Sequence, residues 1–401
     1  MRRIDIAAFA AAGAATVLIA ADQGSYFQRS WPWVGLALAA AGALALLAPL
    51  DVQLGRPALA LVAATAAISL WTLVSWFWSQ EPPTTLTEAL RAPIYMAAAV
   101  TFVTLAGMGG SLGLGCGVAA GTTGLAAYAL LDRGLTQGQG KLLAVPLGYA
   151  NALGGLCAIG LAVVAVLGWR LRRHALAAGL ALVAAAILTA ALALTSSRGS
   201  WASLAAALLV AAAGRWRARA ALAVAAALVS LSVVTSFTTA SRPLQARGDY
   251  WHAAWQVAKH HPLGGSGAGT FDLGWAAYGD LGRWGEALDA HSLYLETLAE
   301  LGIVGLVLVL GLVAPAAAAL RSERLRLGAC AALVGSVAFL VHSDLDWDWE
   351  MPAVTVVGVA CLAAACPEPA PRLGSKLRVT LLVLEGVVLV TYGAYLIVHN
   401  V

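Results

Sequence analysis

Apolar runs of about 17–25 residues recur along almost the whole chain, and each is long enough to cross roughly 30 Å of hydrocarbon as a helix. Hydrophobic residues make up 61% of the chain and charged residues only 11%, whereas an average soluble domain has about 25% charged residues. A soluble core of this size cannot use so much apolar surface. Because backbone groups in hydrocarbon must be bonded within their own segment, we predict an all-α polytopic membrane protein.

The apolar runs predict about 12–13 transmembrane helices. Nine spans are expected within residues 1–237, an extracytoplasmic loop with an interfacial helix at 238–290, and four spans within 291–401. No small-x-small cleavage site follows the first run, so we expect a helix there instead of a signal peptide. The expected spans are 5–21, 32–49, 57–77, 86–106, 108–130, 148–168, 174–194, 199–213, 217–237, 291–318, 325–342, 351–366 and 376–398.

Lysine and arginine in the turns predict the orientation, because cytoplasmic turns of membrane proteins are enriched in both. With the N-terminus in the cytoplasm, the basic turns at 56, 170–173, 215–219, 321–326 and 372–378 are all cytoplasmic, and the opposite turns hold mainly acids. The loop at 238–290 then faces away from the cytoplasm. Cytoplasmic turns account for the net charge of +4, so no nucleic-acid partner is expected.

The five cysteines lie within the expected spans or at their ends, and none lies in the large loop. We therefore expect neither a disulfide nor a zinc site.

Arg198 lies between two expected spans, in the sequence Ser197-Arg198-Gly199. One interpretation is a turn arginine that reaches lipid headgroups. The other is an anion site, because a guanidinium binds phosphate oxygens at two points at once and the neighbouring glycine allows close approach to the backbone. Arg91, at the outer start of a span, is a further candidate for contact with such an anion.

Arg247 precedes an aromatic helical pattern that includes Tyr250, Trp251 and Trp255. The aromatic face is typical of an interfacial helix without a catalytic role. Arg247, expected at the helix start, is the functional candidate in this segment. Asp249 is interpreted as the cap of that helix.

His291 stands at the expected start of a span. A histidine in this position is either a hydrogen-bonded structural residue or a base, since its ordinary pKa lies close to neutral pH. Glu296 and Glu300 project from other faces of the same helix, so any group that orients the imidazole must come from another segment.

The run Gly264–Gly269 has neither the spacing nor the preceding strand of a dinucleotide-binding loop. It is interpreted as a flexible turn or as an anion nest in which Gly265 and Gly267 contact substrate through their backbone N–H groups.

Acids alternate with tryptophans between His342 and Glu350. Carboxylates of this density suit a divalent cation. However, acids at every second position point all around a helix, and the tryptophans fit an interfacial belt, so we expect no metal site here.

The order of these features resembles the O-antigen ligase/polymerase (Wzy-type) family over roughly residues 145–350. The segments that carry the resemblance are 149–154 with Asn151, 197–199, 247–251, 261–267, 291–296 leading into 300–305, and 342–350. The first 140 residues match only as generic membrane spans.

The resemblance implies a bundle of the membrane glycosyltransferase C type in the cytoplasmic (inner) membrane, with its site on the extracytoplasmic face. Such proteins move a glycan from an undecaprenyl-diphosphate carrier to a hydroxyl of lipopolysaccharide core, a growing glycan or a protein. Arg198 and Arg247 would hold the diphosphate, His291 would activate the acceptor, and Asn151 would contact substrate. Fixed cationic groups stabilise a departing anion, so neither a metal nor a cofactor is expected, and direct attack predicts inversion.

Two alternatives belong to other classes. A transporter or flippase of a lipid-linked glycan or small solute needs charges or broken helices near the middle of the membrane. Only Glu385, deep in the last span, fits that pattern. A non-enzymatic assembly partner would leave the two arginines and His291 unexplained, and we therefore favour the enzyme.

Overall fold

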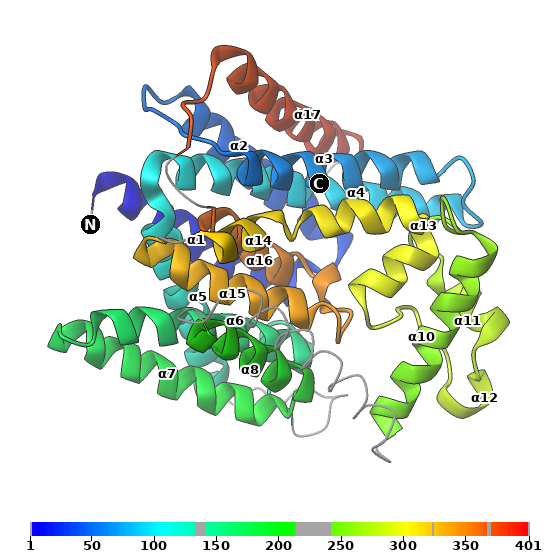
Figure 1. The fold of residues 1–401 in the computed structure, drawn as a ribbon. Helices are drawn as coiled ribbons and strands as arrows, with labels where there is room; N and C mark the ends of the chain where they lie inside the picture. Colours follow the sequence, from blue (N-terminus) through cyan, green and yellow to red (C-terminus); the bar gives the residue numbers. More distant parts are fainter. Residues whose placement is uncertain (1, 133–141, 214–241, 323–324, 367–369, 400–401) are drawn as a thin grey trace.

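The computed structural model describes residues 2–132, 142–213, 242–322, 325–366 and 370–399 (Figure 1). Within these residues it shows an all-α polytopic membrane protein. Eight helical segments are long and apolar enough to cross a membrane, and three shorter apolar helices accompany them. An isolated bridge between Gln53 and Arg372 is the only β-type pairing in the described part of the chain.

The helices of the first half are α1 (Arg3–Ala21), α2 (Trp31–Leu47), α3 (Arg56–Ser75), α4 (Pro82–Leu105), α5 (Ser111–Asp132), α6 (Ala150–Leu171), α7 (Ala175–Thr195) and α8 (Arg198–Ala213). Those of the second half are α10 (Arg242–His260), α11 (Phe271–Tyr278), α12 (Leu281–Trp284), α13 (Leu293–Gly311), α14 (Ala314–Arg321), α15 (Leu327–His342), α16 (Pro352–Ala364) and α17 (Ser375–His399).

The predicted spans coincide with these helices wherever the chain is described. A π-helical turn at Ala106–Gly110 joins α4 to α5, with Gly109 at φ 90°. The long span predicted at 291–318 corresponds to two helices, α13 and α14. The span predicted at 217–237 lies outside the described residues.

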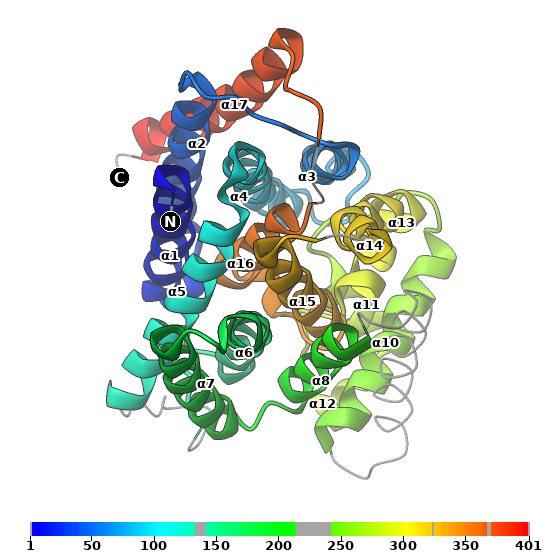
Figure 2. The same cartoon turned by 60° about the vertical axis from the view of Figure 1, so that its left-hand side comes forward.

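Helix α16 lies at the centre of the bundle, and Figure 2 shows α4, α6 and α15 around it. Every one of its 13 residues is buried, which fits a sequence that is apolar on all sides. Helices α7 and α17 lie on opposite sides of the bundle. Only 17% and 22% of their most apolar windows are buried, so both present most of their surface to lipid.

A row of glycines on α5 allows α1 to approach it closely. A Cβ atom at Gly113 would lie 2.1 Å from the backbone oxygen of Asp5, and one at Gly117 would lie 2.5 Å from that of Phe9. Small residues at this spacing are the usual means by which membrane helices pack tightly without a hydrophobic driving force. The pair α1–α5 is therefore a rigid wall of the bundle.

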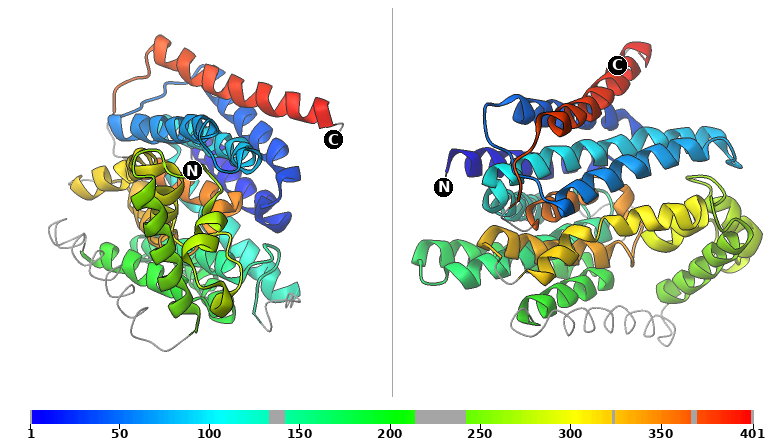
Figure 3. Two further views of the ribbon diagram at one scale, coloured as in Figure 1. Left: turned by 90° about the vertical axis from the view of Figure 1, so that its right-hand side faces the viewer. Right: turned by 45° about the horizontal axis from the view of Figure 1, so that its top comes forward.

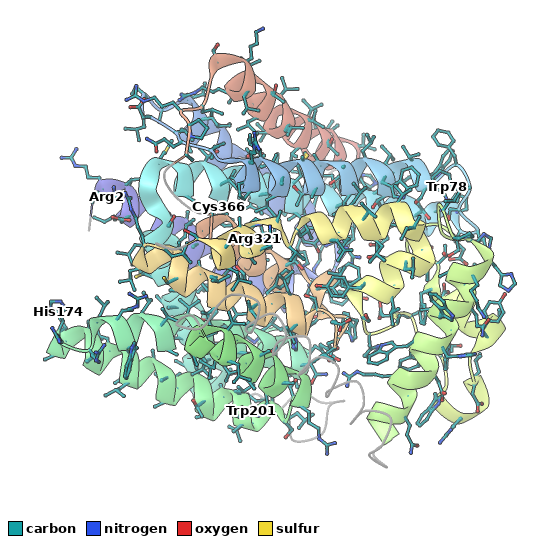
Figure 4. All side chains as sticks on the ribbon, in the orientation of Figure 1. Arg2, Trp78, His174, Trp201, Arg321 and Cys366 are labelled. Atoms are coloured by element: carbon teal, nitrogen blue, oxygen red, sulfur yellow. The ribbon has the colours of Figure 1, made fainter. Side chains whose placement is uncertain are left out.

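Helices α10, α11 and α12 lie across one end of the bundle, which we call the site end (Figure 3). In Figure 4, Trp78 lies at this end, whereas Arg2 and His174 lie at the opposite end. The Nε1 atom of Trp78 donates a hydrogen bond to the oxygen of Gly264 at 3.1 Å. The turn after α3 is thus attached to the segment that covers the site end.

Helix α13 is broken at Gly302, which has φ 67° and ψ −168°. The break frees backbone groups that the loop 262–267 then binds: Ser266 N donates to Ala299 O at 3.0 Å, and Ile303 N donates to Pro262 O at 2.9 Å. Irregular backbone at membrane depth is tolerated only where protein or water satisfies it. The sequence pattern had predicted a continuous span, and this insertion of a loop into a helix is the main departure from it.

Candidate functional site

Asp346 lies at the centre of a polar cluster at the site end, in the turn that follows α15. Its Oδ2 atom accepts hydrogen bonds from Arg247 Nη2 at 2.8 Å and from Asn151 Nδ2 at 2.6 Å. Its Oδ1 atom accepts one from the Tyr149 hydroxyl at 2.8 Å. We call these four residues the Asp346 cluster. It joins α6, α10 and the turn after α15.

The Asp346 cluster holds a cation beside an ionised carboxylate. Burial raises the pKa of Asp346, but the Arg247 guanidinium, the two nearby histidines and the Tyr149 hydroxyl together outweigh burial, and the pKa falls below its ordinary value. The side chain of Arg247 is 15% exposed, and its Nε atom is buried without a hydrogen-bond partner. Asp346 therefore fixes one edge of the guanidinium. Arg247 lies inside α10, which begins at Arg242, and not at the helix start that the sequence pattern had predicted.

His291 immediately precedes the residue that caps α13, with φ at +54°. Its ring stacks on Tyr250 with 5.3 Å between the ring centroids. Nδ1 lies 3.3 Å from the backbone oxygen of Asp289. A proton on Nδ1 donates to that oxygen, which leaves Nε2 as an acceptor. The orienting group is thus a backbone carbonyl in the loop before α13. The sequence had predicted only that any orienting group must come from outside this helix.

Burial lowers the pKa of His291 below 6.5, and the nearby Arg247 guanidinium lowers it further, although Asp346 acts in the opposite direction. The imidazole is consequently neutral near pH 7 and able to accept a proton. Tyr250, on which it stacks, lies three residues after Arg247 on α10, so the two share one helix face. The structure therefore brings His291 and Arg247 to the same site.

Arg198 is the first residue of α8 and its side chain is exposed. The next residue, Gly199, packs against the turn that carries the Asp346 cluster, and a Cβ atom there would lie 3.4 Å from Leu345 Cβ. Arg198 is thus placed on the same side of the bundle as Asp346. The role of Arg198 in the predicted site stays a prediction.

Arg91 lies in α4 and is only 4% exposed. Its guanidinium forms ion pairs with Glu88 and, at 3.0 Å, with Glu350. Two carboxylates already balance this cation. We therefore leave Arg91 out of the diphosphate site for which the sequence had suggested it.

Comparison with known protein families identifies one match. Residues 183–310 match the sequence model of the family described as O-Antigen ligase. This stretch is similar to the O-antigen ligase family. The matched stretch contains Arg198, Arg247 and His291, whereas Asn151 and Asp346 lie outside it. A search of curated proteins finds no match.

Within the matched stretch, the glycine-rich run does not offer its backbone to a ligand. Gly265 N donates to His261 O at 3.0 Å, and Gly267 N donates to Glu300 O at 2.9 Å. These bonds contradict the predicted contacts of Gly265 and Gly267 with substrate. Gly265 has φ +71°, and a Cβ there would lie 2.1 Å from Glu300 C, so glycine is required for the close approach to α13.

The carboxyl group that this run binds belongs to the protein itself. Gly269 N and Phe271 N donate to the two carboxylate oxygens of Glu300 at 2.8 and 2.9 Å. Glu300 had no visible partner in the sequence, and the structure supplies it from the run that had been interpreted as an anion nest.

The acids between His342 and Glu350 connect different elements. Asp344 accepts a hydrogen bond from Ser292 at 2.9 Å, Asp348 binds His342 at 2.8 Å, and Glu350 binds Arg91. The segment forms turns and a short 3₁₀ helix at Asp348–Glu350, so the acids do not spread around a regular helix as predicted. Each fixes a different part of the site end. The sequence could not show the pairings of Asp344 and Glu350, because Ser292 and Arg91 lie far away in the chain.

A further group of three carboxyl side chains was not recognised from the sequence. Ligand oxygens of Asp289, Glu296 and Glu350 lie within 4.8 Å of one another. Glu296 also accepts a hydrogen bond from Ala290 N at 2.7 Å, and Glu350 is paired with Arg91. Burial raises the pKa of Asp289 well above its ordinary value, and Glu350 adds to the effect. Close carboxyl groups share protons when no cation separates them.

Proposed function

We propose that the chain is a membrane glycosyltransferase that moves a glycan from an undecaprenyl-diphosphate carrier to an acceptor hydroxyl, with inversion at the anomeric carbon. The reaction would take place at the extracytoplasmic face of the cytoplasmic membrane. The observation that carries this proposal is the pairing of a neutral histidine with a positioned arginine within the matched stretch, at one end of an apolar bundle.

The proposed step needs one base and one anion-binding group. His291 Nε2 takes the proton of the acceptor hydroxyl, and the acceptor oxygen forms a bond to the anomeric carbon. The bond between that carbon and the diphosphate oxygen breaks, and the diphosphate leaves with the electron pair. Arg247 and Arg198 stabilise the negative charge on the leaving group, and such preorganised charge is effective in a water-poor site.

Asp346 has a supporting part in this proposal. It holds the Arg247 guanidinium in one orientation before the substrate arrives, and a preorganised cation loses less entropy on binding than a mobile one. Asn151, Tyr149 and the backbone N–H of Trp347 occupy the remaining acceptor sites of the carboxylate. The sequence had suggested that Asn151 contacts substrate. In this proposal, Asn151 instead holds the Asp346 carboxylate in place.

One feature of the structure favours the alternative of a transporter, because α13 is broken within the bundle. However, the groups freed at the break bind the chain itself: Ala299 O and Glu300 O accept from the loop 262–267, and Leu301 O accepts from Trp71 Nε1 at 3.0 Å. Glu385 packs between α2 and α4, with its Oε1 atom 3.4 Å from the Thr101 hydroxyl. Both features connect helices to each other, and we retain the enzyme.

The test uses the full chain purified in nanodiscs, with the lipid-linked glycan fraction extracted from the host membrane as donor. Transfer to the host acceptor fraction is measured for the wild type, His291→Ala and Arg247→Ala. His252→Ala and Arg283→Ala are the matched controls, because both residues are exposed at the same end of the bundle. Loss of transfer in the first pair and retention in the second supports the proposal. Equal activity in all five proteins contradicts it.

A further inference from the structure

A buried side-chain pair closes the turn that carries Asp346. Residues 343–347, which we call the 343–347 turn, connect the end of α15 with the 3₁₀ helix at Asp348–Glu350. The flanking residues His342 and Asp348 are fully buried, and His342 Nε2 lies 2.8 Å from Asp348 Oδ2. A proton on Nε2 donates to that carboxylate. This bond adds to the backbone bond from Leu345 N to His342 O at 2.9 Å.

The 343–347 turn binds the helix that carries Arg247. Asp346 lies in this turn, and its carboxylate accepts from Arg247 Nη2 at 2.8 Å and from Asn151 Nδ2 on α6 at 2.6 Å. The backbone N–H of Trp347, in the same turn, donates to Asp346 Oδ1 at 3.0 Å. The direction of the carboxylate, and with it the position of the guanidinium, therefore depends on the conformation of the turn.

The same turn also binds the segment that carries His291. Ser292 follows His291 and caps α13, and its hydroxyl donates to Asp344 Oδ1 at 2.9 Å. Leu293 N donates to Ser343 O at 2.8 Å. The proposed base and the proposed anion-binding arginine are thus both attached to one short turn.

The imidazole of His342 packs against glycines of two helices. A Cβ atom at Gly155 on α6 would lie 2.6 Å from its Nε2 atom, and one at Gly199 on α8 would lie 3.9 Å from its Nδ1 atom. Among the described residues, neither Nδ1 of His342 nor Oδ1 of Asp348 has a hydrogen-bond partner. Buried polar pairs with unsatisfied atoms are often no more stabilising than apolar residues of the same size. The bond across the 343–347 turn therefore points to a role in geometry.

We propose that His342 and Asp348 are positioning residues, whose pair holds the 343–347 turn in the conformation that places Arg247 and His291 at one substrate. This rests on the proposed function, because it takes Arg247 as the group that binds the diphosphate and His291 as the base. Neither member of the pair touches the substrate, and both act through the turn. Such a constellation works only within about 0.5 Å of its productive geometry.

Two amide substitutions separate positioning from packing. The side-chain nitrogen of glutamine can take the place of Nε2, whereas that of asparagine reaches only the place of Nδ1, so His342→Gln can keep the bond to Asp348 and His342→Asn loses it. The measurement is equilibrium binding of undecaprenyl diphosphate to the full chain in nanodiscs. We expect His342→Gln to bind like the wild type and His342→Asn to bind about tenfold or more weakly, the factor for one lost charge-assisted hydrogen bond. His252→Asn, at an exposed position on α10, is the control.

A double variant shows whether His342 acts through Asp346. Asp346→Asn keeps the size of the side chain but removes the ion pair with Arg247. In that background, His342→Asn should weaken carrier binding little further, because residues in one network are not additive. The same loss in both backgrounds would overturn the positioning role in favour of a general effect on the fold. Equal losses in His342→Gln and His342→Asn would overturn it in the same way.

Gly155→Ala is the second variant if His342→Asn does not fold, as judged by thermal unfolding. The added methyl group pushes the His342 ring away from Asp348, since its carbon would lie 2.6 Å from the ring. The same loss of carrier binding is expected. Gly179→Ala is the matched control, because a Cβ there has no atom of the described chain within 4 Å.

Two outcomes separate this proposal from the function on which it rests. If Arg247→Ala binds undecaprenyl diphosphate as well as the wild type, the proposed diphosphate site fails, and the positioning role fails with it. If binding depends on Arg247 while folded His342→Asn and Gly155→Ala bind like the wild type, only the positioning role fails.

Discussion

Arg247 and Asp346 are 99 positions apart in the sequence, yet their side chains meet at 2.8 Å inside the site end of the bundle. The carboxylate has 1% of its surface exposed and the guanidinium 15%. This ion pair connects a helix of the stretch that matches the O-antigen ligase family with a turn outside it. Its loss therefore affects both the stability of the site end and the orientation of the arginine.

Replacing Asp346 with alanine leaves a mostly buried guanidinium without its carboxylate. Removing one partner of a buried ion pair typically costs about 3–5 kcal/mol, and we expect a loss of that size in the free energy of unfolding, measured by denaturant titration in detergent. The control is Asp51→Ala, which breaks an exposed pair with Arg372 and should cost less than about 1 kcal/mol. The double variant Arg247→Ala/Asp346→Ala should be more stable than Asp346→Ala and still inactive. Equal stability of Asp346→Ala and Asp51→Ala would show that the pair is not structural.

The sequence predicted most of the fold because the signal for a membrane helix is local. Length and apolar character alone placed the helices, including the short α8 and α16. The break at Gly302 was not predictable in the same way, since it depends on backbone bonds to the loop 262–267 that precedes α13. A helical break in an apolar stretch has little sequence signature when its partners come from another segment.

For the site, the sequence indicated residue types but not pairings. Arg247 and His291 were recognisable as candidates for an anion-binding group and a base. The role of Asp346 was not, because Tyr149 and Asn151 approach it from α6 and Arg247 from α10. The glycines at 265 and 267 were misread for a related reason: a run with positive φ angles serves a close approach to backbone as readily as it serves a phosphate.

The acidic limb of the pH–rate profile should lie below pH 6.5. His291 must be neutral to accept a proton, and burial lowers its pKa below 6.5, so activity is lost as the pH falls through that lowered value. His291→Ala should reduce transfer by about 10²–10⁴ and abolish this limb. The measurement is initial transfer rate between pH 5 and 8, with His252→Ala as the control. An acidic limb that persists in His291→Ala would assign the titration to another group.

Arg198→Lys and Arg247→Lys keep the charge but lose the two-point fork that binds phosphate oxygens. A lost charge-assisted hydrogen bond in a dry site is worth roughly 1.5–3 kcal/mol, or on the order of tenfold to a hundredfold in rate. We expect each variant to lose that much transfer while it remains folded. Arg283→Lys, at an exposed position on α12, is the control. A mild effect in both variants would mean that charge alone suffices.

A chelator should leave the transfer rate unchanged if the arginines neutralise the diphosphate. The measurement compares initial rates with EDTA, with added Mg²⁺ and with added Mn²⁺. Activity that requires an added divalent cation would contradict the arginine mechanism. It would direct attention to Asp289, Glu296 and Glu350, the carboxyl groups whose oxygens lie within 4.8 Å of one another.

The orientation of the bundle predicts which end can be labelled from outside the cell. Gly282→Cys, at the site end, should react in intact cells with a membrane-impermeant maleimide, whereas Arg172→Cys, in the turn between α6 and α7, should react only after permeabilisation. Both positions are exposed, and a Cβ at Gly282 meets only the Asp280 carboxylate, at 3.6 Å. The wild type measures labelling of the five native cysteines, of which Cys157 and Cys361 are buried and the other three partly buried. Labelling of Arg172→Cys but not Gly282→Cys in intact cells would place the site in the cytoplasm. A carrier-linked glycan on the outer leaflet would then be out of reach of His291.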